Sequence, residues 1–123
     1  MTRPAIVSLE PGAEPPAIDQ PGPDRLVRGT PVRRTWSRYA RGEVDCGVWE
    51  CEPGAWRIDF PATPGRTREE FFHVLAGHIR LIRDDGAVTE VRAGEACVIP
   101  AGFQGVFEVV EPVRKYYVMI DKR

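Results

Sequence analysis

The sequence predicts an all-β protein with a single core, built as a sandwich or barrel. Three observations lead to this fold class. From residue 32 onward, short runs rich in β-branched and aromatic residues alternate with turn-forming residues. No window carries apolar residues at helical spacing over enough turns to predict a helix. The length of 123 residues is that of one ordinary domain.

The segment from Met1 to Pro31 is expected to form a Pro-rich arm, and residues 32–123 the single domain. This segment contains seven prolines and three glycines, which interrupt regular structure. Ile6, Ile18 and Leu26 are among the apolar residues that would anchor an extended arm on a neighbouring surface. A disordered tail is the alternative.

The expected strands share short length and β-branched or aromatic content. They cover Gly47–Glu52, Trp56–Phe60, Glu70–Ala76, His78–Arg83, Val88–Val91, Ala96–Ile99, Val106–Val110 and Lys115–Ile120. Turn formers separate them, namely Pro53-Gly54, residues 61–65, Ala76-Gly77, Asp84-Asp85-Gly86, Ala93-Gly94 and residues 100–102. Asp-Gly between two strands is typical of a hairpin.

Charge and cysteine content exclude several function classes. Lys and Arg total 17 against 18 Asp and Glu, so no large field of one sign attracts nucleic acid or an anionic membrane. No apolar run is long enough to cross a bilayer, and the N-terminus does not resemble a signal peptide, which predicts a soluble, cytoplasmic protein. Cys46, Cys51 and Cys97 lack Cys-x-x-Cys spacing and are expected to be free thiols rather than parts of a Cys/His zinc cluster.

Two spaced motifs make the fold prediction more specific, and on them the sequence resembles the cupin superfamily. The first cupin motif reads G-x5-H-x-H-x3,4-E-x6-G, and its second half stands here as Glu70 to Gly77. The second reads G-x5-P-x-G-x2-H-x3-N, and Gly94, Pro100 and Gly102 occupy its glycine and proline positions. The resemblance implies a cupin (RmlC-like) double-stranded β-helix, or jelly-roll barrel. Gly77, Gly94 and Gly102 are expected at tight turns between strands.

The metal ligands of these motifs are almost all replaced. In cupins that bind metal, two His, the Glu and a last His hold the ion. The counterparts here are Pro64 and Arg66, or Thr63 and Gly65 with the longer spacer, together with Glu70 and Gly105. A catalytic transition-metal site normally offers three or more protein ligands, so we expect no metal and no cofactor.

A narrower resemblance covers residues 46–54, 70–77, 98–105 and 111–117, which are similar to the ureidoglycine aminohydrolase-type cupin domain family. That resemblance implies a manganese enzyme whose metal is held by a Glu, two His and a Gln. This chain would supply only Glu70 and Gln104 of such a set. Small single-domain members of the family have no assigned activity, so the family name alone does not predict a function.

The candidate ligand-binding residues of the barrel interior are Glu70, Trp49, Phe72, Gln104, Phe107 and Tyr117. Strand alternation places Phe72 on the face of Glu70, and places Phe107 on the face of Gly105. Glu70 in apolar surroundings suits an acid, a base or a ligand anchor. The equally weighted alternative is a buried ion pair with Arg57, Arg80 or another strand arginine.

The two histidines do not fit a metal site. His73 lies one residue off the Glu70 face, and His78 follows the expected Gly77 turn. Both are expected at the surface or at a subunit interface.

Three functions remain open from the sequence. The favoured one is a metal-free cupin that binds a small polar or aromatic metabolite in the barrel. An enzyme that resembles ureidoglycine aminohydrolase and acts on a small ureide or amidine is the second, with Glu70 as acid and base or as one ligand of an incomplete site. A structural module with a filled barrel is the third. A homodimer is expected, because jelly rolls of this size expose sheet edges and the arm carries apolar residues without a core of its own.

Overall fold

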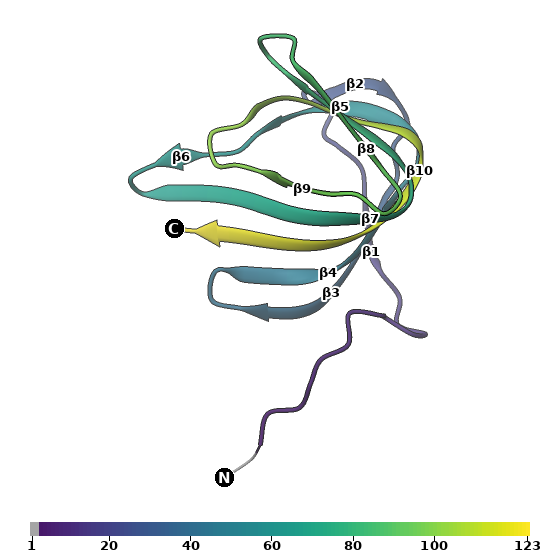
Figure 1. Ribbon diagram of the computed structural model, residues 1–123, viewed down its shortest axis with the longest axis vertical. Helices are drawn as coiled ribbons and strands as arrows, with labels where there is room; N and C mark the ends of the chain where they lie inside the picture. The colour runs from purple at the N-terminus through teal and green to yellow at the C-terminus, as the bar shows by residue number, and fades with distance from the viewer. Residues whose placement is uncertain (1–2) are drawn as a thin grey trace.

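The computed structural model describes residues 3–123 as a strongly curved antiparallel sheet of ten strands (Figure 1). The strands are β1 (Ala17–Asp19), β2 (Leu26–Gly29), β3 (Arg33–Arg41), β4 (Val44–Cys51), β5 (Gly54–Asp59), β6 (Ala62–Thr63), β7 (Arg66–Arg83), β8 (Val88–Arg92), β9 (Ala96–Ile99) and β10 (Gln104–Lys122). No helix occurs among residues 3–123, and so none that could span a membrane. The predicted all-β class is confirmed.

The long strands β7 and β10 form the spine of the sheet. β10 pairs with β7 along both of its halves, while its first half also pairs with β5 and its second half with β4. The sheet therefore folds into two layers. We call the β4 layer the set of β1, β3, β4, the second half of β10, the first half of β7, β6 and β9. The β5 layer contains β2, β5, the first half of β10, the second half of β7 and β8.

Gly77 lies where β7 bends from one layer into the other. The predicted hairpin turn at Ala76-Gly77 is wrong, because β7 continues through both residues. Gly77 has a φ of 92°, and a Cβ atom there would lie 2.1 Å from the carbonyl oxygen of Pro112 on β10. The β7–β10 register shifts at this point, between Val109 and Lys115. Glycine is thus required by the close approach of two bent strands. Gly94 and Gly102 do lie in turns, with φ values of 87° and 86°.

Strand β3 was not predicted from the sequence. Its residues, Arg33–Arg41, include four arginines and only scattered apolar side chains. The side-chain pattern of this segment does not indicate a strand. The strand forms because its backbone pairs with β4 on one side and with β1 on the other. The separately predicted segments on either side of Gly77 merge into β7, and Val106–Val110 and Lys115–Ile120 merge into β10.

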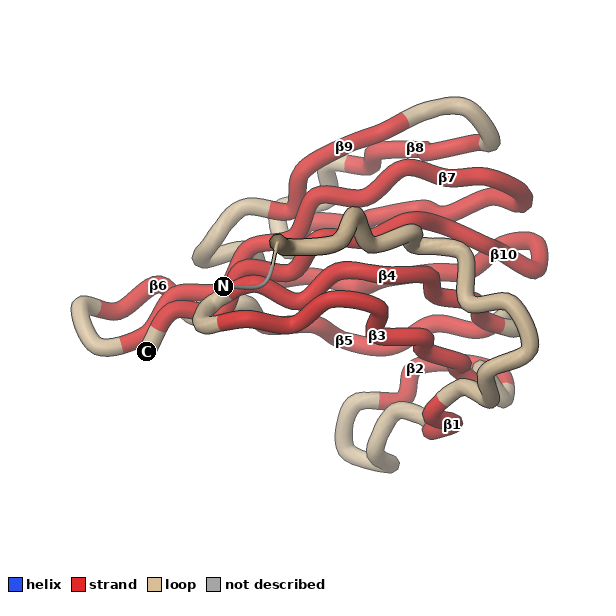
Figure 2. The backbone as a smooth tube through the Cα atoms, turned by 90° about the horizontal axis from the view of Figure 1, so that it is seen from below, coloured by secondary structure: helices blue, strands red, loops and turns tan. Residues whose placement is uncertain are grey.

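The Pro-rich segment packs on the sheet of its own chain. β1 and β2 add short strands to β3 and β5. Residues 8–14 cross the outer face of the β4 layer, and Figure 2 shows this loop passing over the strands. Trp36 Nε1 donates a hydrogen bond of 2.8 Å to the Glu14 carbonyl, and Arg38 Nε donates one of 3.1 Å to the Ser8 carbonyl. The hydroxyl of Tyr116 donates to the Glu10 carboxylate.

The main apolar core lies between the two layers. Its most completely buried members are Phe72, Val74, Ile79, Ile99 and Val109. Cys51 is buried, Cys46 and Cys97 are half-buried, and all three thiols are free. Burial raises the pKa of Cys51 to about 12 and that of Cys97 to about 11, as expected for thiols that serve packing.

Replacing Gly77 by Ala tests the bend. We expect Gly77→Ala to lower the free energy of unfolding by at least about 2 kcal/mol more than Gly86→Ala, measured by urea denaturation. Gly86 has the same φ of 92°, but a Cβ there meets nothing within 4 Å, so it reports the cost of backbone conformation alone. Equal losses in the two variants would show that contact with Pro112 does not constrain the bend.

Candidate functional site

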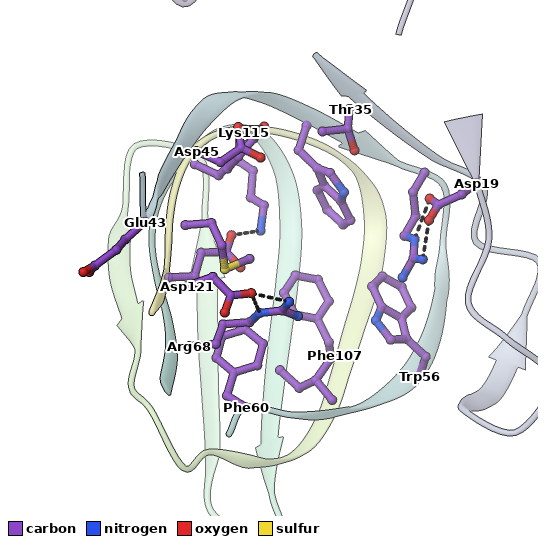
Figure 3. Close-up of a pocket in the computed structure, with 16 residues that line it drawn as sticks. Asp19, Thr35, Glu43, Asp45, Trp56, Phe60, Arg68, Phe107, Lys115 and Asp121 are labelled. Carbon is purple, nitrogen blue, oxygen red and sulfur yellow. Dashed lines mark hydrogen bonds and ion pairs between the residues drawn. The ribbon is translucent and has the colours of Figure 1, made fainter. Parts of the chain in front are cut away.

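A cavity of about 430 Å³ lies inside the curved sheet (Figure 3). Its apolar walls are mainly aromatic and come from β4, β5, the segment after β5, and β10. They are Trp49, Trp56, Phe60, Phe107 and Tyr117. Trp56 and Phe107 stack with their ring centroids 5.0 Å apart, and Trp49 meets Phe107 edge-on at 5.7 Å. The rings hold one another in place and leave a preformed space.

A buried ion pair lies on the wall of this cavity. Lys115 Nζ is 2.7 Å from Glu70 Oε2, and the two side chains are 4% and 8% exposed. The ammonium also lies 4.2 Å from the ring centroid of Phe72, 4.4 Å from that of Trp49 and 4.9 Å from that of Phe107. Three aromatic faces and one carboxylate therefore surround the side-chain nitrogen of Lys115.

The partner of Glu70 corrects the sequence prediction, which named arginines. Arg57 binds Asp84, and Arg80 binds Glu90 and Glu108, on surfaces outside the cavity. Lys115 reaches Glu70 because both face inward on the paired strands β10 and β7. Tyr117, predicted to face the interior, lies two residues after Lys115, so strand alternation contained the signal for this lysine.

Two further ion pairs border the cavity. Arg33 donates to Asp19 at 2.9 and 2.7 Å, and its guanidinium lies 5.4 Å from the ring centroid of Trp56. Arg68 donates to Asp121 at 3.0 and 2.6 Å. The hydrogen bonds from Arg68, and then from Arg66, lower the pKa of Asp121 to about 2. The arginines on the cavity wall are thus neutralised by their own carboxylates.

Asp45 differs from the other inward-facing carboxylates of the wall. It accepts hydrogen bonds from Ser37 Oγ at 2.6 Å and from the Tyr117 hydroxyl at 3.2 Å, and has no ion pair within residues 3–123. Burial, and then the charge of Asp45, raise the pKa of Tyr117 well above its usual value. The phenol therefore stays protonated and donates to Asp45 near neutral pH.

The structure brings most of the predicted interior residues together. Trp49, Glu70, Phe107 and Tyr117 line the cavity. Phe72 does not line the cavity but is fully buried behind it, where its ring contacts Lys115 and Phe107. The prediction for Gln104 is wrong.

Gln104 is exposed, and its Nε2 is 3.4 Å from Asp59 Oδ1 on the adjacent strand. The cause is strand alternation along β10. Phe107 and Val109 are buried and face inward, so the even-numbered position of Gln104 faces outward. The prediction rested on the likeness of Gln104 to a metal-ligand glutamine in another cupin, and alternation along β10 places the Gln104 side chain on the opposite face.

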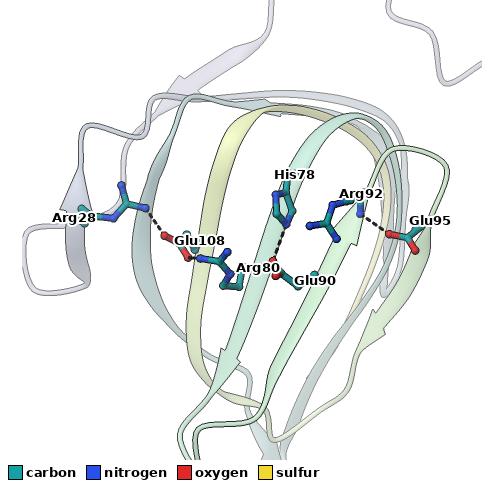
Figure 4. A network of polar contacts seen from close by, with 7 residues as sticks. All are labelled: Arg28, His78, Arg80, Glu90, Arg92, Glu95 and Glu108. Atoms are coloured by element: carbon teal, nitrogen blue, oxygen red, sulfur yellow. Dashed lines mark hydrogen bonds and ion pairs between the residues drawn. The ribbon is translucent and has the colours of Figure 1, made fainter.

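The histidines lie outside the cavity. His78 is buried, which corrects its predicted place at the surface, and its Nε2 is 2.7 Å from Glu90 Oε1. It ends a ladder of charges on the outer face of the β5 layer, in which Arg28, Glu108, Arg80 and Glu90 alternate in sign (Figure 4). His73 is half-buried and faces Tyr116 across the outer face of the β4 layer.

The residues at the cupin metal position do not fit a transition-metal ion. Glu70, the one remaining ligand of the motif, is bound to an ammonium. Arg66, the counterpart of a motif His with the shorter spacer, binds Asp121. Within the described part of the chain, no three His, Cys, Asp or Glu side chains converge as metal ligands would.

Removing the charge of Lys115 tests the buried pair. We expect Lys115→Met to lower the free energy of unfolding by about 3–5 kcal/mol, because it leaves the Glu70 carboxylate buried without a partner. The double variant Glu70→Gln/Lys115→Met should recover much of this loss in urea denaturation. Arg57→Met is the control, since the Arg57–Asp84 pair is about half exposed and its loss should cost about 1 kcal/mol or less. A loss for Lys115→Met as small as the control's would contradict a coupled pair.

Comparison with solved structures supports the fold. A protein of unknown function from Pseudomonas syringae pv. tomato is 18% identical, with a TM-score of 0.73, over 94% of this chain and 44% of that chain. The EutQ protein of Clostridium difficile is 22% identical, with a TM-score of 0.63, over 73% of this chain and 63% of that one. A putative ethanolamine utilization protein Q of Salmonella typhimurium is 16% identical, with a TM-score of 0.62, over 89% and 98%.

The chain thus spans less than two thirds of the length of the first two of these proteins. A search of curated proteins found no match.

At these identities the structural likeness establishes the cupin fold, an all-β curled sheet. The sequence matches the family described as EutQ-like cupin domain over residues 39–117, and it does not single out the ureidoglycine aminohydrolase type. Together with the β7–β10 spine and the motif residues Glu70 to Gly77, this match shows that the chain belongs to the EutQ-like cupin domain family.

Proposed function

We propose that this chain is a metal-free binding cupin that holds a small organic cation in the cavity. The observation that carries the proposal is the ion pair of Lys115 with Glu70 inside an aromatic-walled cavity of about 430 Å³. In metal-binding cupins the corresponding carboxylate holds the ion. Here a side-chain ammonium neutralises that carboxylate, and the remaining volume is free for an organic ligand.

The cavity has the size and surface of a small-molecule site. Such sites enclose roughly 300–1,000 Å³ and combine apolar or aromatic walls with a few polar groups that orient the ligand. Trp49, Trp56, Phe107 and Tyr117 supply the apolar contact area here. Ion pairs hold most of the charged groups in fixed positions, so little ordering is needed when a ligand binds.

The charge of the lining favours a cation. Arg33, Arg68 and Lys115 are each bound to a carboxylate. Asp45, which also lines the cavity, has no ion pair within the described residues. Glu43 has none there either, but it is exposed and its carboxylate points away from the cavity (Figure 3). A primary or substituted ammonium would donate hydrogen bonds to Asp45 and place its carbon atoms against the rings. An anionic ligand of the same size would face this excess of negative charge.

An enzyme acting on a small ureide or amidine is the alternative, as the narrower resemblance implies. It would require Glu70 to act as an acid and base, and hence to be released from Lys115. The closeness of this pair, at 2.7 Å, and its burial support binding over that chemistry. Hydrolysis of a ureide by the purified protein, lost in Glu70→Gln, would favour the enzyme.

Thermal melts with two probes of equal size and opposite charge test the ligand class. We expect benzylammonium to raise the midpoint by a few degrees at millimolar concentration, and benzoate to leave it unchanged, because a ligand stabilises by mass action only the state that binds it. Asp45→Asn should abolish the benzylammonium shift. Glu111→Gln, which changes an exposed carboxylate outside the cavity, is the matched control. A shift with benzoate that equals or exceeds the benzylammonium shift would overturn the charge assignment.

Elemental analysis tests the metal-free part of the proposal. After purification without added ions, we expect less than stoichiometric manganese, iron and zinc, and an unchanged melting temperature in chelator. One tightly held ion per chain that is lost in Glu70→Ala would contradict it. In that case the ion would have displaced Lys115 from Glu70.

A further inference from the structure

A second hollow, of about 270 Å³, lies beside the cavity and shares part of its wall. The residues that line both spaces are Arg33, Trp56, Ile58, Phe60 and Arg68. The rest of the second hollow is lined by β5 and by the loop of residues 20–25 between β1 and β2. A ligand that lies against Trp56 in the cavity therefore borders this hollow as well.

Arginines dominate the polar lining of the second hollow, which we call the arginine pocket. Arg25, Arg33, Arg57 and Arg68 line it, against Asp59 as the carboxylate of the same lining. Three of these arginines form ion pairs, but with carboxylates that do not line the arginine pocket. The groups that face the pocket are thus mostly hydrogen-bond donors.

Arg25 supplies a positive charge that no carboxylate offsets. It forms no ion pair within residues 3–123, and its side chain is exposed. Its backbone is fixed, because its N–H donates to the Gly22 carbonyl at 2.9 Å and its carbonyl accepts from the N–H of Arg57 at 2.9 Å. Asp24, the carboxylate next to it in the chain, does not line the pocket. The loop therefore holds one free guanidinium at the rim.

The ion-paired arginines of the shared wall also keep donors free. Arg33 uses Nε and Nη2 to bind Asp19, and Arg68 uses Nε and Nη2 to bind Asp121. The Nη1 group of each has no hydrogen-bond partner within the described residues. A guanidinium has five N–H groups, so pairing with one carboxylate does not exhaust it. An anion with two or more oxygens can accept from these groups.

We propose that the ligand of the cavity carries an anionic group, a carboxylate or a phosphate, at the end opposite its ammonium, and that the arginine pocket binds it. The inference rests on the proposed binding of an ammonium at Asp45. Figure 3 shows Asp45 on one side of the cavity and Asp19, the partner of Arg33, on the other. An ammonium held at Asp45 thus directs the far end of the ligand toward Arg33 and Arg25.

The two ends of such a ligand support each other. An anion alone gains little, because three of the four arginines already have a carboxylate partner. An anion joined to a bound ammonium is held at a high local concentration beside the same arginines. The proposed ligand is therefore a small molecule that carries both charges, with an apolar or aromatic part between them.

Calorimetric titration with probes of one shape tests the anionic end. We expect 4-(aminomethyl)benzoate to bind about tenfold more tightly than benzylammonium, because its carboxylate adds charge-assisted hydrogen bonds to guanidinium groups. The uncharged analogue 4-(aminomethyl)benzamide should bind about as tightly as benzylammonium. The corresponding phosphonate, 4-(aminomethyl)phenylphosphonate, separates the two anions. If it binds more tightly than the benzoate, the anionic group is a phosphate, and if less tightly, a carboxylate.

Replacing Arg25 locates the anion. Arg25→Gln should remove most of the advantage of 4-(aminomethyl)benzoate and leave the affinity for benzylammonium unchanged. Arg92→Gln is the matched control, since Arg92 is an exposed arginine of β8 that lines neither space and has no ion pair in the described chain. It should keep the full advantage.

The outcomes separate this inference from the proposed function. Equal affinities for benzylammonium, the benzoate, the phosphonate and the benzamide would overturn the anionic end and leave ammonium binding in place. So would an advantage of the benzoate that survives Arg25→Gln as well as it survives Arg92→Gln. Failure of benzylammonium itself to bind would overturn the proposed function, and this inference with it.

Discussion

The arrangement of the two layers depends on the close contact of β7 with β10 at their common bend. Each strand belongs to both layers, so the bend at Gly77 and Pro112 sets how the layers face each other and how much space they enclose. A side chain at Gly77 would collide with the backbone of β10. Because β7 and β10 also carry Glu70, Lys115, Phe107 and Tyr117, the constraint that shapes the barrel also positions the walls of its cavity.

The buried pair of Glu70 and Lys115 connects this fold to its proposed function. Burying two charges has a high desolvation cost, and such pairs often contribute little net stability. The gain here is in specificity, because the ammonium holds the motif carboxylate and leaves Asp45 as the inward-facing carboxylate without an ion pair in the described chain. A cupin that lost its histidines could have filled its interior with apolar side chains. This chain retains an open cavity with aromatic walls and the Lys115–Glu70 ion pair in its lining.

The outer faces of the two layers differ in chemical character. The charge ladder of the β5 layer satisfies each of its members within one chain and gives no reason for a partner. The outer face of the β4 layer lies on the reverse side of the strands that carry Lys115 and Tyr117, and residues 8–14 cover part of it.

The sequence by itself determined the fold class, the turns at Gly94 and Gly102, and the interior positions of Glu70, Trp49, Phe107 and Tyr117. These follow from local signals: the alternation of side chains along strands, the turn residues between them, and the spacing of Gly94, Pro100 and Gly102. Those signals act over a few residues, and the structure respects them. The interior position predicted for Gln104 was wrong, because side-chain alternation along β10 directs it outward.

Only the tertiary structure decided which long-range partners meet. Glu70 and Lys115 are 45 residues apart, and the choice of Lys115 over an arginine depends on the register of β7 against β10. The same is true of Gly77, whose role as a bend rather than a turn depends on Pro112 across the sheet, and of β3, which exists because β4 and β1 pair with it. Backbone pairing between distant segments, and the side-chain contacts that it creates, leave no short-range pattern in the chain.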